Sequence, residues 1–153
     1  METLDSRVRI LWTMRAVVLA TILTGLAVVI DRFAVAIDWR LVAALWVVAA
    51  AVGTVHAILH YRRWGFGIQD DDLYLVRGVV TQVDTSVPYV RVQHTDTQRG
   101  PVERLVGLSS VVVYTAGSRG ADIRIPGLQP ERATELREQL RDLAAESEAT
   151  DAV

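Results

Sequence analysis

The stretch LVAALWVVAAAVGTVHAIL, residues 41–59, contains no charged side chain. A helix of these nineteen residues is about 28 Å long, close to the ~30 Å hydrocarbon core of a bilayer. A second apolar stretch precedes it over residues 10–30 and contains one charge, Arg15, which lies near one end and can reach the lipid headgroups. Aromatic residues that suit a membrane interface stand near the ends of both stretches: Trp12, Trp39, Tyr61 and Trp64. The sequence therefore predicts a transmembrane hairpin with helices over about residues 10–30 and 41–60.

The first half of the chain allows two other interpretations. A buried hairpin of a soluble protein would need a large partner surface, because both helices are apolar all round. A cleaved signal peptide would end near the Ala-Val-Ala sequence at residues 34–36, but the charged residues 31 and 32 lie before that site. The stretch at residues 41–59 would anchor the protein in either case.

The arginines around the two stretches predict the orientation of the hairpin. Five flank its outer ends, whereas two lie in the connecting segment, residues 31–40: Arg7, Arg9, Arg15, Arg62 and Arg63 against Arg32 and Arg40. Because cytoplasmic flanks carry the excess of Arg and Lys, we expect both termini in the cytoplasm. Arg62, Arg63 and Trp64 are then expected at the membrane surface, where each arginine near anionic lipid contributes about 1 kcal/mol.

Composition excludes several classes of function. The chain has no cysteine, so it can form neither a disulfide framework nor a thiolate metal site. It contains sixteen arginines and no lysine, and residues 65–153 carry nine arginines against fourteen acidic residues, a net charge of −5. An acidic domain is a poor candidate for nucleic acid, whose binding depends on neutralising phosphates. No nucleic-acid partner is expected.

The second half alternates in a pattern typical of strands. The clearest period-two pattern, rich in β-branched residues, lies at 79–87. Further strands are expected at 64–69, 73–77, 90–97, 109–115 and 123–125, and a turn is expected at residues 117–120. Gly78 supplies a tight turn between two of these segments, and Pro126-Gly127 is expected to end the last one.

A helix is predicted to begin at Pro130, a residue suited to a first helical turn. Ala133, Leu136, Leu140 and Leu143 recur at helical spacing, and the stripe they form is expected to pack on the sheet. Residues 146–153 are polar and are expected to be a disordered tail. The predicted division is residues 1–64 for the membrane part, 65–145 for a cytoplasmic domain and 146–153 for the tail.

Residues 87–117 resemble the bacterial pleckstrin-homology-like domain of YdbS-like membrane proteins. The residues that carry the resemblance are Pro88, Arg99, Gly100, Pro101, Arg104, Leu105, Gly107 and Leu108. The resemblance implies an α+β membrane protein: a two-helix transmembrane hairpin, then a small antiparallel β-domain with a C-terminal capping helix. It implies no reaction. Phosphoinositide binding is not carried over, because the chain has no lysine-rich strand-loop pair.

Two patterns in the apolar stretches bear on packing and ligands. Small residues recur four apart, at Ala49, Gly53 and Ala57 and at Thr21 and Gly25, which allows helices to approach closely within the hairpin or between chains. His56 and His60 also lie four apart, a spacing that can hold a metal. An interfacial pair without a ligand is the favoured interpretation, because residues 16–30 offer no further ligand.

No catalytic motif is found. Residues 107–111 read Gly-Leu-Ser-Ser-Val, which fails the G-x-S-x-G pattern of serine hydrolases. No catalytic, cofactor or metal site is therefore predicted. The expected function is a non-enzymatic binding or assembly module with the bilayer and another membrane protein as partners, either one with the same domain or a second copy. The alternatives are an accessory subunit of a transport complex and a membrane enzyme with an unrecognised site.

Overall fold

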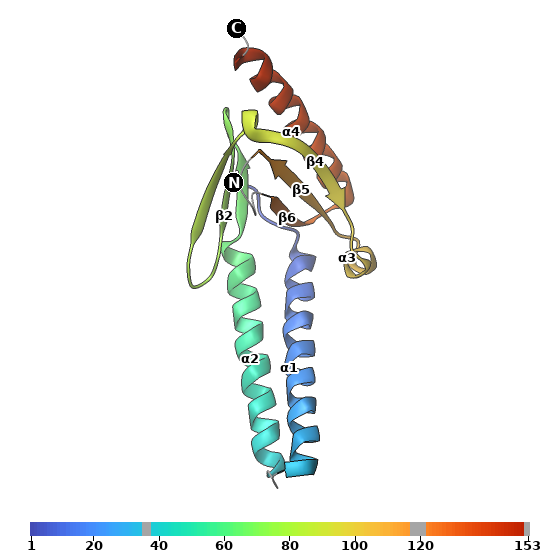
Figure 1. Ribbon diagram of the computed structural model, residues 1–153. Helices are drawn as coiled ribbons and strands as arrows, with labels where there is room; N and C mark the ends of the chain where they lie inside the picture. The colour runs from blue at the N-terminus through green and yellow to red at the C-terminus, as the bar shows by residue number, and fades with distance from the viewer. Residues whose placement is uncertain (35–37, 117–121, 152–153) are drawn as a thin grey trace. The chain divides into compact units, whose positions relative to one another are not determined.

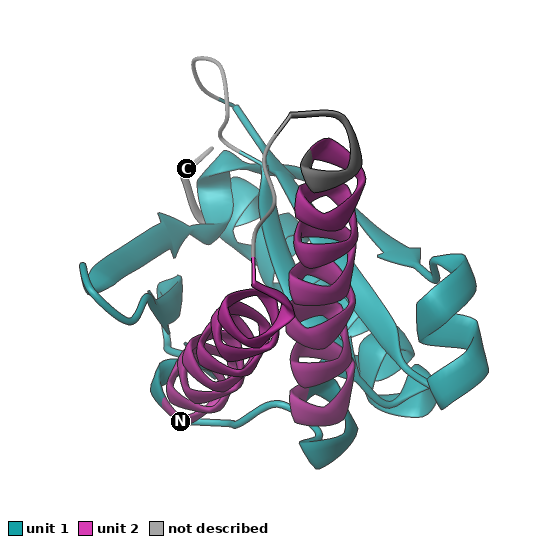
Figure 2. Ribbon diagram, turned by 90° about the horizontal axis from the view of Figure 1, so that it is seen from below, with its two compact units in different colours: residues 1–8, 63–153 teal, residues 9–62 magenta. Residues whose placement is uncertain are grey.

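The computed structural model describes residues 1–34, 38–116 and 122–151. Within them the chain forms two compact units, residues 9–62 and residues 1–8 with 63–153 (Figure 2). The expected turn at 117–120 and the middle of the connecting segment, 35–37, lie outside the described residues.

The first unit is a pair of long helices, α1 (Ser6–Ala34) and α2 (Trp39–Arg63), seen in Figure 1. Each contains a window apolar enough to cross a membrane, and only 6% of each window is buried within the protein. Leu23 and Val52 are 63% and 64% exposed, as expected of side chains that meet lipid. This pattern fits the predicted hairpin and leaves its apolar surface without a protein cover among the described residues.

The second unit contains two antiparallel sheets, each with three strands in sequential order. The first comprises β1 (Gly65–Ile68), β2 (Asp72–Arg77) and β3 (Val83–Pro88); the second comprises β4 (Val92–Gln98), β5 (Ser109–Thr115) and β6 (Ile123–Leu128). A 3-10 turn, η1 (Tyr89–Arg91), joins the sheets, α3 (Pro101–Val106) joins β4 to β5, and α4 (Pro130–Asp151) follows β6. The predicted α+β class, with two long helices followed by an antiparallel β-domain and a C-terminal helix, is confirmed.

The strand predicted from residue 79 begins four residues later. Arg77 pairs with Val83 in the β2–β3 register, so the residues between them close the hairpin. Gly78 turns the chain with φ +111°, and Val80 is 93% exposed. The alternating pattern of the sequence continues into this turn, where Val80 meets solvent. Periodicity alone therefore could not show where the strand begins.

The last strand, by contrast, continues beyond its predicted end. Pro126 and Gly127 lie inside β6, which is an edge strand of its sheet and so tolerates a residue without an N–H. The carbonyl of Gly127 accepts a hydrogen bond from the amide of Asp5 at 2.8 Å. The N-terminal segment thereby supplies a hydrogen-bond donor to one backbone carbonyl on this strand edge.

The stripe on α4 packs against β4, η1 and β5. Ala133, Leu136 and Leu140 are fully buried, Ala144 is 8% exposed, and Leu143 is only half-buried. The predicted disordered tail is incorrect as far as Asp151, where α4 ends. Glu146, Glu148 and Ala149 are good helix formers, and the packing of Ala144 holds the turn before them.

Residues 1–8 belong to the second unit rather than to the membrane part. Glu2 and Phe66 exchange backbone hydrogen bonds of 2.7 and 3.1 Å, so the N-terminus bridges to the edge of β1. The Glu2 carboxylate accepts two bonds from Arg132 on α4, at 2.6 and 2.7 Å. Val8 is 1% exposed, and it lies so close to Gly127 (φ +66°) that a Cβ there would meet its Cγ2 at 2.6 Å. The β-domain is therefore completed by the N-terminal residues, which include the first turn of α1.

Candidate functional site

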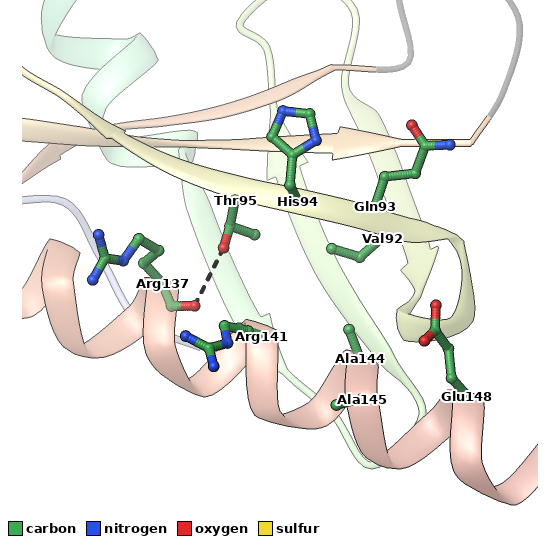
Figure 3. A pocket seen from close by; sticks show the side chains of 9 residues that line it. All are labelled: Val92, Gln93, His94, Thr95, Arg137, Arg141, Ala144, Ala145 and Glu148. Carbon is green, nitrogen blue, oxygen red and sulfur yellow. Dashed lines mark hydrogen bonds between the residues drawn. The ribbon is translucent and has the colours of Figure 1, made fainter.

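A cleft lies between β4 and α4 in the second unit (Figure 3). Its lining comes from two segments, Val92, Gln93, His94 and Thr95 of β4 and Arg137, Arg141, Ala144, Ala145 and Glu148 of α4. Thr95 points toward α4 and donates a hydrogen bond of 3.3 Å from its hydroxyl to the carbonyl of Arg137, whereas His94 and Gln93 point away from the helix. This bond joins the strand to the helix beside an open cleft of about 500 Å³.

The charges of the cleft are separated along α4. Arg137 and Arg141 lie one turn apart at one end, and Glu148 lies at the other (Figure 3). Arg137 also contacts the exposed carboxylate of Glu138 at 3.4 Å, a surface pair of little energetic weight. In a domain of net charge −5, this end of the cleft carries two arginines, of which Arg137 is paired with Glu138. It can therefore receive a carboxylate from another molecule.

The strand beside the cleft is an edge strand. β4 pairs with β5 on one side, with an irregularity between Val92 and His94, and no strand among the described residues pairs with its other side. The ring of His94 stacks on that of Tyr114 from β5 at 4.2 Å, which holds the imidazole over the sheet. An unpaired edge is a template for another extended segment. Sequence reasoning missed this cleft, because its arginines and alanines look like the solvated face of a helix.

The residues that carry the family resemblance have structural roles around α3. Pro88 ends β3, while Arg99, Gly100 and Pro101 lead into α3. The Gly100 amide donates to the Glu103 carboxylate at 2.7 Å, and Glu103 also pairs with Arg124 at 3.1 Å.

The second part of the motif ends that helix. Arg104 donates from its Nε to the carbonyl of Arg99 at 3.4 Å, and Gly107 takes the left-handed conformation with φ +69°. Leu108 then enters the core at 1% exposure, whereas Leu105 is 87% exposed. This motif builds the β4–β5 connection and does not line the cleft.

Three residues were expected at the membrane surface, and the two arginines lie at the protein surface whereas the tryptophan is buried. Arg62 is exposed, and the guanidinium of Arg63 donates to the carbonyl of Val79. Trp64 is only 5% exposed and contacts the ring of Phe66 edge-on at 6.2 Å. It lies in the core of the domain and cannot serve as an exposed interfacial aromatic.

Only some of the small residues in the helices lie where α1 and α2 are in contact. A Cβ on Gly53 would meet the Cβ of Ala16 at 2.8 Å, so α1 and α2 approach closely there within one chain. Ala57 is buried at 5% exposure and Ala49 is half-buried. Gly25 has no atom within 4 Å of a Cβ built on it, and the Thr21 hydroxyl accepts a hydrogen bond from the Trp46 indole at 3.1 Å. The matching small surface on α1 is thus Ala16 instead of Gly25.

His56 and His60 stack with their ring centroids 6.1 Å apart, and His60 also contacts Trp12 at 4.5 Å. Within the described ranges, no three side chains of His, Asp or Glu come together in a group that could hold a metal ion.

Two long apolar helices, two small antiparallel sheets and a C-terminal helix define a membrane protein with a pleckstrin-homology-like domain. The chain belongs to the bacterial PH domain family, whose model matches residues 14–144. It is 30% identical over 86 residues to the transmembrane protein YdbS of Bacillus subtilis (strain 168). That match covers 56% of this chain and 52% of YdbS, so the chain matches about half the length of this curated relative. No solved structure matches the chain.

Proposed function

We propose that this protein is a non-enzymatic, membrane-anchored assembly module that binds another membrane protein through its pleckstrin-homology-like domain. The observation that carries the proposal is the cleft between β4 and α4, where an unpaired strand edge lies beside two arginines. Backbone pairing at the edge would supply affinity, and the arginines would select a segment that carries an acidic residue.

The transmembrane hairpin would place the binding domain at the membrane, on its cytoplasmic side. Five arginines flank the outer ends of the two helices and two flank the connecting segment, which supports a domain on the cytoplasmic side. A partner anchored in the same membrane would meet the domain at a high effective concentration, so a modest intrinsic affinity would suffice. The partner is then either a larger membrane protein or a second copy of this chain.

The proposal is tested by photo-crosslinking in native membranes. A photoreactive phenylalanine analogue placed at Gln93, an exposed residue on the β4 strand that borders the cleft, should give a discrete cross-linked product. The same analogue at Gln82, exposed in the β2–β3 turn, is the matched control and should not. Arg141→Glu should reduce the product at position 93, whereas Arg77→Glu on β2 should leave it unchanged.

Equal products from positions 93 and 82 would contradict binding in the cleft. The same conclusion would follow if Arg77→Glu reduced the product as strongly as Arg141→Glu does.

A further inference from the structure

A groove runs along one face of the helix pair, between α1 and α2. Small residues line its floor, where Ala20 and Ala57 are 4% and 5% exposed and Gly53 lies against Ala16. Larger aliphatic side chains, Leu19, Leu23 and Val52, form its rims and are exposed. Because the floor side chains are short, the two helices leave an apolar channel of about 560 Å³ that their own atoms do not fill.

The polar residues of the groove gather at one end. Trp12, Arg15, His56 and His60 lie there, at the ends of the helices that adjoin the domain in sequence. The described structure assigns Arg15 no salt bridge, and no acidic residue lies within residues 6–30 or 39–63. An arginine in a membrane helix without a protein carboxylate calls for an anionic partner of another kind.

The depth of these groups suits a lipid. Arg9 lies over the ring of Tyr61 at 6.0 Å, and Trp12, about one turn later in α1, contacts His60. Arg15 follows three residues after Trp12, further from the start of the helix. Arg15 is therefore about 4.5 Å deeper than Trp12, a depth from which its long side chain can reach back to the phosphate and glycerol groups if Trp12 marks the interface. From Trp12 to Leu23 the groove extends eleven residues, or about 16 Å, close to half of the ~30 Å hydrocarbon core. It thus has the length of a single leaflet.

We propose that this groove binds one anionic phospholipid, with its phosphate at Arg15 and the two histidines and one acyl chain along the small-residue floor. Charge complementarity with Arg15 selects the headgroup, since the groove end contains no acid, and the two imidazoles add hydrogen-bonding nitrogens. The apolar channel distinguishes a lipid from a free phosphate ion. This site lies in the hairpin, so it is independent of the cleft proposed for protein binding.

The test uses the full chain in nanodiscs with photoactivatable phosphatidylglycerol or phosphatidylcholine, each carrying its reactive group in the acyl chain. Adducts are mapped by mass spectrometry. We expect adducts of phosphatidylglycerol to concentrate at residues 16–23 and 49–53 and to exceed those of phosphatidylcholine about fivefold, the effect of one arginine near an anionic headgroup. Arg15→Gln should abolish this preference and Arg15→Lys should keep it. Arg40→Gln, which removes one charge at the other end of α2, is the matched control and should not change it.

Ala49→Leu tests the acyl part of the site, since a larger side chain on the floor should lower the adducts of both lipids there. Added inorganic phosphate should not compete. The proposal is overturned if the two lipids label equally, if adducts spread evenly over the exposed helix faces, or if Arg40→Gln acts like Arg15→Gln. Competition by inorganic phosphate would also overturn it, because the site would then recognise the ion alone.

Discussion

Leu140→Ala should unfold the domain more easily, because Leu140 is fully buried where α4 meets β4, η1 and β5. The change removes three carbons, which at ~0.8 kcal/mol per buried methylene amounts to about 2.4 kcal/mol of lost transfer free energy. A residual cavity adds to this cost and places the total within the usual range of about 2–5 kcal/mol. Leu143→Ala, at a half-buried position on the same helix, is the matched control and should cost about 1 kcal/mol.

Hydrogen exchange of the full chain in lipid nanodiscs, followed by mass spectrometry, measures this difference where it arises. Peptides from β4 and β5 should lose protection by at least about 60-fold in Leu140→Ala, the factor that corresponds to 2.4 kcal/mol. Peptides from α1 and α2 in the membrane should be unchanged. A loss of protection below about fivefold, or equal losses for the two variants, would refute the conclusion that the stripe on α4 forms the core of the domain.

Three further predictions concern single contacts. Gly53→Leu should separate α1 from α2 at Ala16 and lower the thermal stability of the hairpin in lipid; unchanged stability would mean that this face does not hold the helices together. Gly127→Ala should destabilise the domain by at least about 1 kcal/mol in chemical denaturation, because it combines a positive φ with a clash against Val8, and wild-type stability would contradict that packing. The pKa of Asp5 is lowered chiefly by the hydrogen bond that its carboxylate accepts from the first-turn amide of α1, so Asp5→Ala should cost about 1 kcal/mol. That cost should be fully present above the ordinary carboxyl pKa and should vanish as the pH falls through the lowered one; a difference that did not depend on pH would exclude this cap.

The elements of this fold could largely be predicted because local patterns encode them. The apolar runs, the position of Pro130 and the fully buried Leu136 all follow from periodicity and residue type. The start of β3 could not be predicted, because the hairpin turn at residues 78–82 is rich in valine and continues the strand pattern. α3 was missed because six residues are too few for a helical period to be visible.

The features that depend on distant contacts were out of reach of the sequence. Glu2 meets Arg132 across a separation of 130 residues, and no local pattern marks either residue as a partner. The cleft likewise arises only when β4 is placed beside α4, since Arg141 alone is an ordinary surface arginine. The small residues showed that the helices approach closely, yet the partner of Gly53 is Ala16, which the spacing of Thr21 and Gly25 did not indicate.

We propose that the membrane hairpin holds the domain on the cytoplasmic side, and the absence of cysteine from the chain makes a direct test simple. Single cysteines can be placed at Asp38, in the connecting segment, and at Gln139, on the exposed face of α4. A membrane-impermeant maleimide applied to intact cells should label Asp38→Cys at once and Gln139→Cys only after the membrane is permeabilised. Labelling of Gln139→Cys in intact cells would contradict the account.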